Sequence, residues 1–202
     1  MRVIAGSAGG IQLLVPRRGV RPTMDRVKAA IFSSLGDDVI GAKVLDLFAG
    51  SGGLGIEALS RGASSVLFVE QDRQSIAAIE KNLAKTKLDG RVHHQEVFEF
   101  LRRPNLKERF RIIFADPPYE KTKSGERFTE KLLRDESLPQ LLEPGGIFIL
   151  EKHPGEELPE NAFWKVFRRK TYGATEVVFL QHATRAVALP VSRKPISSVG
   201  GA

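Results

Sequence analysis

Apolar and polar residues alternate along most of the chain with two different periods. Short runs rich in Val, Ile, Leu and Phe are typical of buried strands, and between them lie longer segments whose apolar residues recur every three or four positions, as in helices. Strands that alternate with helices in this way are typical of a parallel sheet with helices on both faces. We predict strands over 44–48, 65–70, 91–95, 111–115 and 146–151, and helices over 73–87, 97–108 and 126–142.

The beginning of the chain departs from this alternation. Residues 2–5 and 11–15 read as two short strands joined by small residues and glycines, so we predict a hairpin. Thr23 is a suitable N-cap for a helix with one apolar face, and Gly36 would end that helix. Residues 1–36 are therefore expected to form a small hairpin-helix extension ahead of the core.

The end of the chain also differs from the core. Residues 163–170 and 176–181 flank a Tyr-Gly pair and predict a closing antiparallel hairpin, so that the core is expected to span residues 37–182. The segment 183–202 has two prolines, no aromatic residue and no clear period, so it lacks the means to bury a core. We expect it to be a flexible tail.

A glycine-rich segment, VLDLFAGSGGLGIEAL, follows the first core strand directly. It reads as a strand, a loop and the start of a helix. Glycines let the backbone approach a ligand closely, and the free N–H groups at the start of a helix favour polar or anionic groups. The loop is therefore suited to a nucleoside-like cofactor.

Two known patterns compete for this loop. Gly50, Gly52 and Gly55 fit the G-x-G-x-x-G fingerprint, and Glu70 ends the next apolar run, which alone would favour a nicotinamide-dependent dehydrogenase. However, Asp46 precedes the first glycine by four residues, and the fingerprint arrives after about forty residues rather than near the start. The D-x-F-x-G-x-G pattern resembles motif I of Rossmann-like S-adenosylmethionine-dependent methyltransferases.

A second motif, Asp116-Pro117-Pro118-Tyr119, follows the strand predicted at 111–115. Alone it would also suit a turn. The Asp116 carboxylate and the carbonyl groups beside the rigid prolines form a set of acceptors, and Tyr119 adds a flat ring. This combination suits a planar base with an exocyclic amine, and it resembles the [DNS]-P-P-[YF] motif IV of amino-methyltransferases.

The reaction expected from the two motifs is transfer of a sulfonium methyl group to an exocyclic nitrogen. Such an amine is a poor nucleophile because its lone pair is conjugated with the ring. Hydrogen bonds to Asp116 and the Pro117 carbonyl would direct the lone pair at the methyl group, while Tyr119 stacks on the base. No metal and no covalent residue is required.

Composition narrows the setting of this chemistry. The chain of 202 residues fits one domain, and its formal charge of +7 with a pI near 9.8 favours a polyanionic partner such as nucleic acid. Without cysteine, disulfides, Cys-ligated zinc and a thiol nucleophile are excluded. The start lacks the apolar region of a signal peptide and no apolar run is long enough to span a membrane, so we expect a cytoplasmic protein without membrane contact.

The order of several segments resembles one family. MRVIAG, RPTMDRVKAAIFSSL, VLDLFAGSGGLGIEALSRGA, FVEQD, FADPPY and KTYG follow one another as in the RsmD family of bacterial ribosomal RNA guanine-N2 methyltransferases, over about residues 1–181. The resemblance implies a Rossmann-like class I methyltransferase with a mostly parallel seven-stranded sheet and a C-terminal antiparallel hairpin. It further implies an enzyme that uses S-adenosylmethionine to methylate guanine N2 in small-subunit ribosomal RNA or an assembling 30S subunit. We expect a monomer.

The resemblance also suggests a role for each matching residue. Asp46, Gly50 and Gly52 would hold the amino acid portion of the cofactor, Glu70 its ribose, and Glu96 its adenine amine, although Glu70 and Glu96 would also suit solvent-facing acids. Thr23 and Asp25 would line the entrance for RNA or simply begin a helix. The expected cofactor-binding residues are Asp46, Phe48, Gly50, Gly52, Glu70, Gln71, Glu96 and Val97, and the expected substrate-binding residues are Arg21, Thr23, Asp25, Arg26, Lys121 and Lys123.

Three other functions remain open at this point. An adenine-N6 methyltransferase acting on DNA or another RNA would share the Asp-Pro-Pro-Tyr motif, although such DNA enzymes generally carry a further recognition domain. An NAD-dependent dehydrogenase would need a hydride-transfer site. Tyr119 and Lys123 have the Tyr-x-x-x-Lys spacing, but Tyr119 belongs to the Asp-Pro-Pro-Tyr motif, and no catalytic His arrangement stands out. A ribosome-assembly protein that binds RNA without methylating it would not need the second motif.

Overall fold

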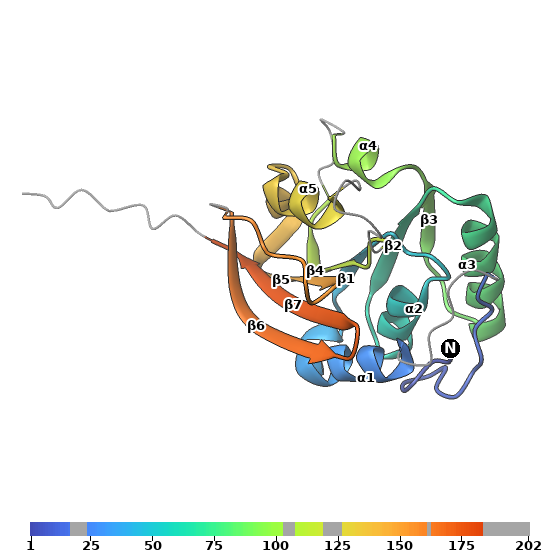
Figure 1. Ribbon diagram of the computed structural model, residues 1–202. Coiled ribbons are helices and arrows are strands. Elements are labelled where there is room, and N and C mark those ends of the chain that lie inside the picture. The colour runs from blue at the N-terminus through green and yellow to red at the C-terminus, as the bar shows by residue number, and fades with distance from the viewer. Residues whose placement is uncertain (17–23, 103–107, 119–126, 161–162, 184–202) are drawn as a thin grey trace, which may run out of the picture.

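The computed structural model describes residues 1–16, 24–102, 108–118, 127–160 and 163–183. In these residues, seven strands form one sheet in the order β3-β2-β1-β4-β5-β7-β6, in which β1 to β5 are parallel and β7 runs antiparallel to both β5 and β6 (Figure 1). The predicted mostly parallel sheet with a closing hairpin is confirmed. The strands are β1 Lys43–Leu47, β2 Ser65–Glu70, β3 Arg91–His94, β4 Phe110–Ala115, β5 Leu142–Lys152, β6 Trp164–Tyr172 and β7 Thr175–His182.

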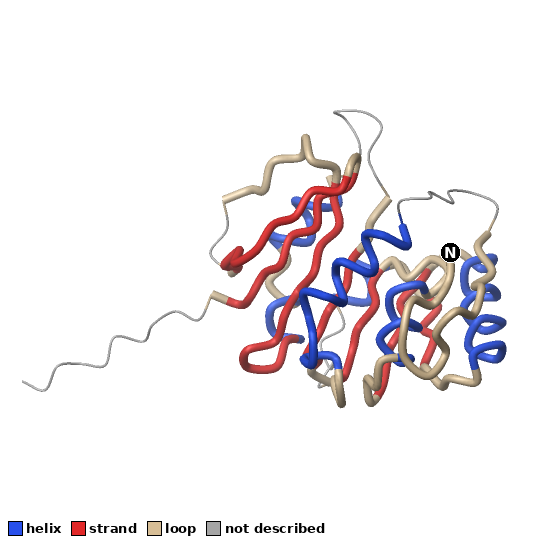
Figure 2. The backbone as a smooth tube through the Cα atoms, turned by 90° about the horizontal axis from the view of Figure 1, so that it is seen from below, coloured by secondary structure: helices blue, strands red, loops and turns tan. Residues whose placement is uncertain are grey.

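Helices cover both faces of the sheet, as the tube in Figure 2 shows. One apolar cluster joins α1, α2 and α3 to the first face, and a second joins α4, α5 and the 3-10 helix η2 to the opposite face. This division follows from the strands, because successive side chains point to opposite faces and both faces are apolar. The helices are α1 Met24–Leu35, η1 Gly36–Val39, α2 Gly53–Ser60, α3 Arg73–Thr86, α4 Val97–Leu101, α5 Phe128–Arg134 and η2 Leu138–Leu141.

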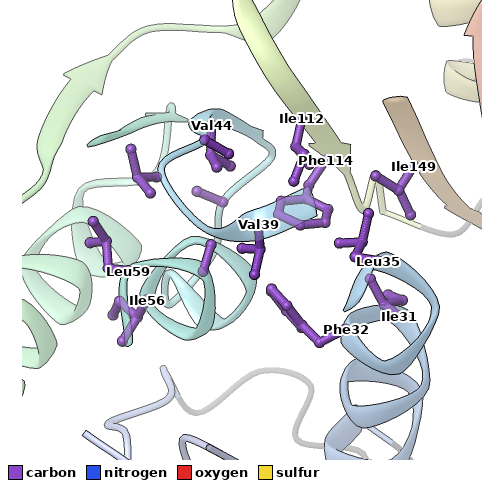
Figure 3. Close-up of a cluster of buried hydrophobic side chains, with 14 of the residues drawn as sticks. Ile31, Phe32, Leu35, Val39, Val44, Ile56, Leu59, Ile112, Phe114 and Ile149 are labelled. Atoms are coloured by element: carbon purple, nitrogen blue, oxygen red, sulfur yellow. The ribbon is translucent and has the colours of Figure 1, made fainter. Parts of the chain in front are cut away.

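Helix α1 belongs to the first apolar cluster although it precedes the core strands. Its Ile31, Phe32 and Leu35 are buried beneath β4 and β5, and the Phe32 and Phe114 ring centroids are 5.7 Å apart (Figure 3). Burial of an apolar side chain of this size contributes about 1.5–3 kcal/mol. The extension predicted over residues 1–36 thus packs on the sheet through the apolar face of its helix.

The predicted N-terminal hairpin is much smaller than expected. Only Arg2 and Gln12 form an antiparallel bridge, supported by main-chain hydrogen bonds such as that from Val3 N to Ile11 O at 2.9 Å. Several other backbone N–H groups bond to side chains of the core instead. Leu14 N, for example, donates to Asn82 Oδ1 of α3 at 2.7 Å.

Two helices predicted in the second half are shorter than expected. Helix α4 ends at Leu101 rather than at residue 108. The helix predicted over 126–142 is divided into α5 and η2, because the Asp135 side chain accepts hydrogen bonds from Ser137 N and Leu138 N, which ends the first helix. Strand β5 accordingly begins at Leu142, four residues earlier than predicted.

The two edges of the sheet differ in length and charge. Strand β3 has 4 residues, whereas β6 has 9 and exposes Arg168, Arg169 and Lys170.

Within the described ranges, no helix combines the length and the apolar character needed to cross a bilayer. Residues 184–202, predicted as a tail, lie outside the described residues.

Candidate active site

A cavity of about 100 Å³ lies at the carboxyl ends of three neighbouring strands. These are β1, β4 and β5, and ligands of open α/β sheets generally bind at this edge. The cavity brings together the two sequence motifs, since Asp46 and the glycine loop line it together with Asp116. Its lining residues are Met1, Lys28, Asp46, Phe48, Ala49, Gly50, Ser51, Gly53, Leu54, Asp116 and Glu151.

The glycines of the loop have two different roles, close packing against the sheet and exposure of the backbone to the cavity. Gly55 allows close packing, because a Cβ there would lie 2.3 Å from the Phe68 ring of β2. Gly50 has a φ of +54°, and among the described residues the one atom within 4 Å of its hypothetical Cβ is Phe48 O at 4.0 Å. A side chain on Gly50 would project into open space beside the cavity, so the backbone there is accessible to a ligand. The loop thus fits the expected cofactor.

Asp46 connects β1 to the helix that follows the loop. Its Oδ2 accepts a hydrogen bond from Gly55 N, in the first turn of α2, at 2.9 Å. The side chain is buried, and this burial raises the pKa of Asp46 to about 8, with the Gly55 N–H opposing the shift and the charges of Asp116 and Glu70 adding to it. Asp46 therefore stabilises the loop and also faces the cavity.

Glu70 is linked to the loop by backbone hydrogen bonds. Its Oε2 accepts from Gly50 N at 2.8 Å, and its Oε1 accepts from Gln71 N and Asp72 N, each at 2.8 Å. A carboxylate has about four acceptor positions, so these three bonds hold the side chain while leaving acceptor capacity for a ligand hydroxyl. Gln71 contributes its backbone N–H here, and its carbonyl O lies 3.0 Å from His94 Nε2.

Lys28 is a buried cation at the other side of the cavity. Its Nζ donates to Arg2 O at 2.6 Å and lies 3.4 Å from Glu57 Oε2. Glu57, with no exposed surface, also accepts from Ile4 N at 2.6 Å and pairs with Arg61 Nε at 2.7 Å. Burial lowers the pKa of Lys28, and the Glu57 carboxylate opposes that shift. These bonds of Lys28 and Glu57 hold the first residues of the chain next to the glycine loop.

Aromatic side chains surround the position where an adenine ring is expected. Phe48 has a φ of +56°, which is unusual for a residue other than glycine, and its ring packs edge-on against Phe98 and Phe128 at 6.2 and 5.6 Å between centroids. Phe98 and Phe128 are stacked with 7° between their planes. Val97 is buried in the core, whereas the Glu96 carboxylate accepts a hydrogen bond from Glu99 N at 2.9 Å and begins α4.

The second motif lies at the end of β4. Asp116 is partly buried and lines the cavity, Pro117 is buried and Pro118 is exposed, while Tyr119 lies outside the described residues. Leu47 of β1 pairs with Ala115 of β4, so the glycine loop and Asp116 leave neighbouring strands at the same level. This register explains why motifs about sixty residues apart meet at one cavity.

Comparisons with known proteins agree with this geometry. A family profile described as conserved hypothetical protein 95 matches residues 1–181. YlbH of Bacillus subtilis, named as a candidate rRNA methyltransferase, is 42% identical over 182 residues, which are 88% of this chain and 96% of YlbH. Ribosomal RNA small subunit methyltransferase D of Escherichia coli K12 is 36% identical over 176 residues, 86% of this chain and 85% of that protein. The chain belongs to the RsmD family.

A solved structure places the RsmD chain in a wider group of folds. RsmC of Thermus thermophilus, a 16S rRNA N2 G1207 methyltransferase solved in complex with AdoMet and guanosine, is 25% identical, with a TM-score of 0.60. The match covers 82% of this RsmD chain and 44% of RsmC. Both the family and the Rossmann-like class I methyltransferase fold predicted from the sequence are confirmed.

The expected substrate-binding residues of the RsmD chain are only partly described. Arg26 is exposed on the first turn of α1. Asp25 accepts a hydrogen bond from Arg2 N at 3.2 Å, and it is not among the residues that line the cavity. Arg21, Thr23, Lys121 and Lys123 lie outside the described residues.

Three residues of the cavity lie outside the two predicted motifs: Met1, Lys28 and Glu151. Lys28 carries a signal, because it lies on the apolar face of α1, one helical turn before Ile31. Glu151 carries another, because it follows the apolar run Ile147–Leu150 much as Glu70 follows Val66–Val69. Met1 carries none, and its place over Gly53 depends on how the RsmD chain folds back.

Proposed function

We propose that this protein transfers the methyl group of S-adenosylmethionine to the exocyclic N2 amine of a guanine in small-subunit ribosomal RNA. The coarser function follows from the family: the protein is an S-adenosylmethionine-dependent methyltransferase of ribosomal RNA. The observation that supports the finer proposal is that the glycine loop and Asp116 line one cavity. A methyl donor and an acceptor amine bound by these two motifs would lie next to each other.

The charges of the cavity fit the two ends of the cofactor. Its methionine portion carries an ammonium and a carboxylate beside a cationic sulfonium, and the cavity has acidic groups at Asp46 and Asp116 with one buried cation, Lys28, among its lining residues. We assign Asp46, Gly50 and Gly52 to the amino acid portion and Glu70 to the ribose hydroxyls. Phe48, Gln71, Glu96 and Val97 complete the proposed cofactor site around the adenine.

The bound cofactor supplies an electrophilic methyl group on its sulfonium. The chain's own residues position the amine that attacks it. Asp116 and the Pro117 carbonyl accept hydrogen bonds from the two N–H groups, which favours a pyramidal nitrogen and aims its lone pair. Pro118 limits the backbone conformation of the motif, and Tyr119 is the proposed stacking partner of the base.

Guanine is favoured over adenine by one structural neighbour. RsmC, which acts on an N2 position of 16S rRNA, was solved with guanosine bound. We propose that Arg21, Thr23, Asp25, Arg26, Lys121 and Lys123 contact the RNA around this base. Contacts of Lys and Arg with phosphates would position an extruded guanine without reading its sequence. We further propose that the protein acts as a monomer in the cytoplasm on assembling 30S subunits.

The test uses small ribosomal subunits that lack the modification. The protein is incubated with these subunits and methyl-labelled S-adenosylmethionine, and the RNA is then digested and its labelled nucleosides are separated. Labelled N2-methylguanosine is the expected product, and sequencing of the labelled fragments locates the guanine. Labelled N6-methyladenosine would replace guanine N2 by adenine N6 as the target, and the absence of label in the presence of bound cofactor would contradict the proposed substrate.

A further inference from the structure

Glu151 lines the cavity, but the reaction described above gives it no role. Its side chain is partly buried near the end of β5 and accepts no hydrogen bond from the residues that the structure describes. A carboxyl group removed from water without a donor is destabilising, typically by about 1–3 kcal/mol. Such a group is stabilised when a ligand supplies the missing donor.

The strand order places Glu151 on the far side of Asp116 from the cofactor loop. Asp46 pairs with Phe114, and Phe114 pairs with Ile149, so these three residues share one level of the sheet. Glu151 lies two residues after Ile149 in β5, and Asp116 lies two residues after Phe114, directly beyond the end of β4. Side chains two apart in an extended chain point to the same face. Both carboxyl groups therefore face the same side as Asp46, with Asp116 in the middle.

A base whose exocyclic amine bound Asp116 would turn one ring edge beside that amine towards Glu151. In guanine the N2 amine lies between N1–H, which is a donor, and N3, which is an acceptor, so N1–H is the edge that suits a carboxyl group. In adenine and cytosine the exocyclic amine neighbours a ring nitrogen that is an acceptor. A carboxyl oxygen beside Asp116 can accept a hydrogen bond from a ring N–H that lies next to the amine. An ionised carboxylate is instead repelled by an unprotonated ring nitrogen at that position. The Asp-Pro-Pro-Tyr motif does not distinguish these bases, whereas an acceptor next to it does.

We propose that Glu151 accepts the N1–H of the target guanine while Asp116 binds its N2 amine, so that Glu151 determines the base specificity. The inference rests on the proposed function. It needs only one acceptor oxygen, which a carboxyl group provides in both its ionised and neutral forms and which glutamine also provides. Glu151 has no part in binding the cofactor.

The experiment compares two bases in one RNA. Small-subunit RNA is assembled into particles with either guanine or 2-aminopurine at the position located by labelling. 2-Aminopurine keeps the 2-amino group but has an unprotonated N1 and no O6. The variants are Glu151→Ala and Glu151→Gln, and Glu143→Ala is a matched control at the other end of β5. Cofactor affinity and melting temperature are measured for every variant.

The wild type is expected to prefer guanine over 2-aminopurine in kcat/KM, by about 10- to 100-fold for one well-formed pair of contacts. Glu151→Ala should lose activity on guanine RNA and change little on 2-aminopurine RNA. The ratio of kcat/KM between the two bases should therefore fall to the value set by contacts other than Glu151. Glu151→Gln should keep activity on guanine RNA, because the amide oxygen can accept N1–H, and should gain activity on 2-aminopurine RNA, because the amide N–H can donate to its unprotonated N1. Glu143→Ala should match the wild type, and cofactor affinity should stay the same in all variants.

Two results would overturn the inference. One is an equal loss by Glu151→Ala on both bases, which would mean a general structural role, and the other is an unchanged preference. Failure of the proposed function looks different, because wild-type protein would then produce no N2-methylguanosine on guanine RNA.

Discussion

The cofactor half and the target half of the cavity hold their carboxyl groups differently. On β1 and β2, Asp46 and Glu70 accept hydrogen bonds from backbone N–H groups of the glycine loop and of the chain after β2. On β5, Glu151 accepts none from the described residues, although it lines the same cavity. The cofactor half is therefore organised by the chain itself, whereas no donor for Glu151 lies among the described residues.

This difference separates two uses of an acidic side chain at a strand end. A carboxylate bonded to backbone amides fixes the shape of a loop, and its removal is expected to change both stability and affinity. A carboxyl group that faces only the cavity contributes little to the fold, and its removal is expected to change specificity. Four variants test this division, beginning with the largest expected effect.

Glu57→Ala tests the buried network that supports the cofactor half. The substitution leaves Lys28 without its carboxylate and Ile4 N without an acceptor, so we expect the free energy of unfolding to fall by about 3–5 kcal/mol. Denaturant unfolding measures the loss. Glu80→Ala, an exposed acid on α3, is the matched control and should cost little. Adding Lys28→Met to Glu57→Ala should recover part of the loss, and no recovery would argue against a shared charge network.

Asp116→Ala tests the acceptor of the target half. The substitution removes the acceptor oxygens that would orient the amine, so we expect kcat to fall about 10²- to 10³-fold. Cofactor affinity, measured by calorimetry, should change little. Asp89→Ala provides an exposed control. Normal turnover by Asp116→Ala, with cofactor bound, would exclude the proposed role of Asp116.

Asp46→Asn tests the buried acid of the cofactor half through pH. The pKa of Asp46 is raised from its ordinary value of 3.8 to about 8 in the folded protein, so between these values the folded state binds more protons than the unfolded state. Wild-type stability should therefore fall as pH rises from 5 to 8, by about 3–4 kcal/mol from this group. The variant should lack that slope in denaturant midpoints. Parallel pH profiles of the two proteins would contradict the raised pKa.

Gly50→Ala has the smallest expected effect on stability. Its φ of +54° should cost about 1 kcal/mol for a residue with a Cβ, without a steric clash. Gly173→Ala, in the turn before β7, has a φ of +59° and equally open surroundings, so it should cost the same. Only Gly50→Ala should also weaken cofactor binding, measured by calorimetry. Equal cofactor affinity in both variants would contradict the proposal that the glycine loop binds the cofactor.

The sequence predicted the parts of the fold that depend on local periodicity. Apolar runs located the parallel strands, and the glycine spacing located the loop and Asp116 at one edge of the sheet. The predicted N-terminal hairpin was too long. Ile4 N and Leu14 N donate to Glu57 and Asn82, which are distant in sequence, and not to the opposite strand of a hairpin. Local patterns carry no information about such partners.

The same limit applies to the candidate site. Glu70 was predicted because it stands at a known distance from the glycine motif, but Glu151 occupies a similar strand end without a motif beside it. Its place in the cavity depends on β5 lying next to β4, which only the order of the strands reveals. Likewise, the division between α5 and η2 depends on Asp135, which binds the backbone after it and competes with a continuous helix.

The contrast between the two edges of the sheet has a consequence for solubility. A long edge strand exposes unpaired N–H and C=O groups that can pair with the edge of another molecule. Strand β6 is such an edge, but the cationic side chains Arg168, Arg169 and Lys170 disfavour the approach of a second copy with the same charge, and β3 is too short to offer a long template. The charged edge therefore protects a folded sheet from growing into an aggregate.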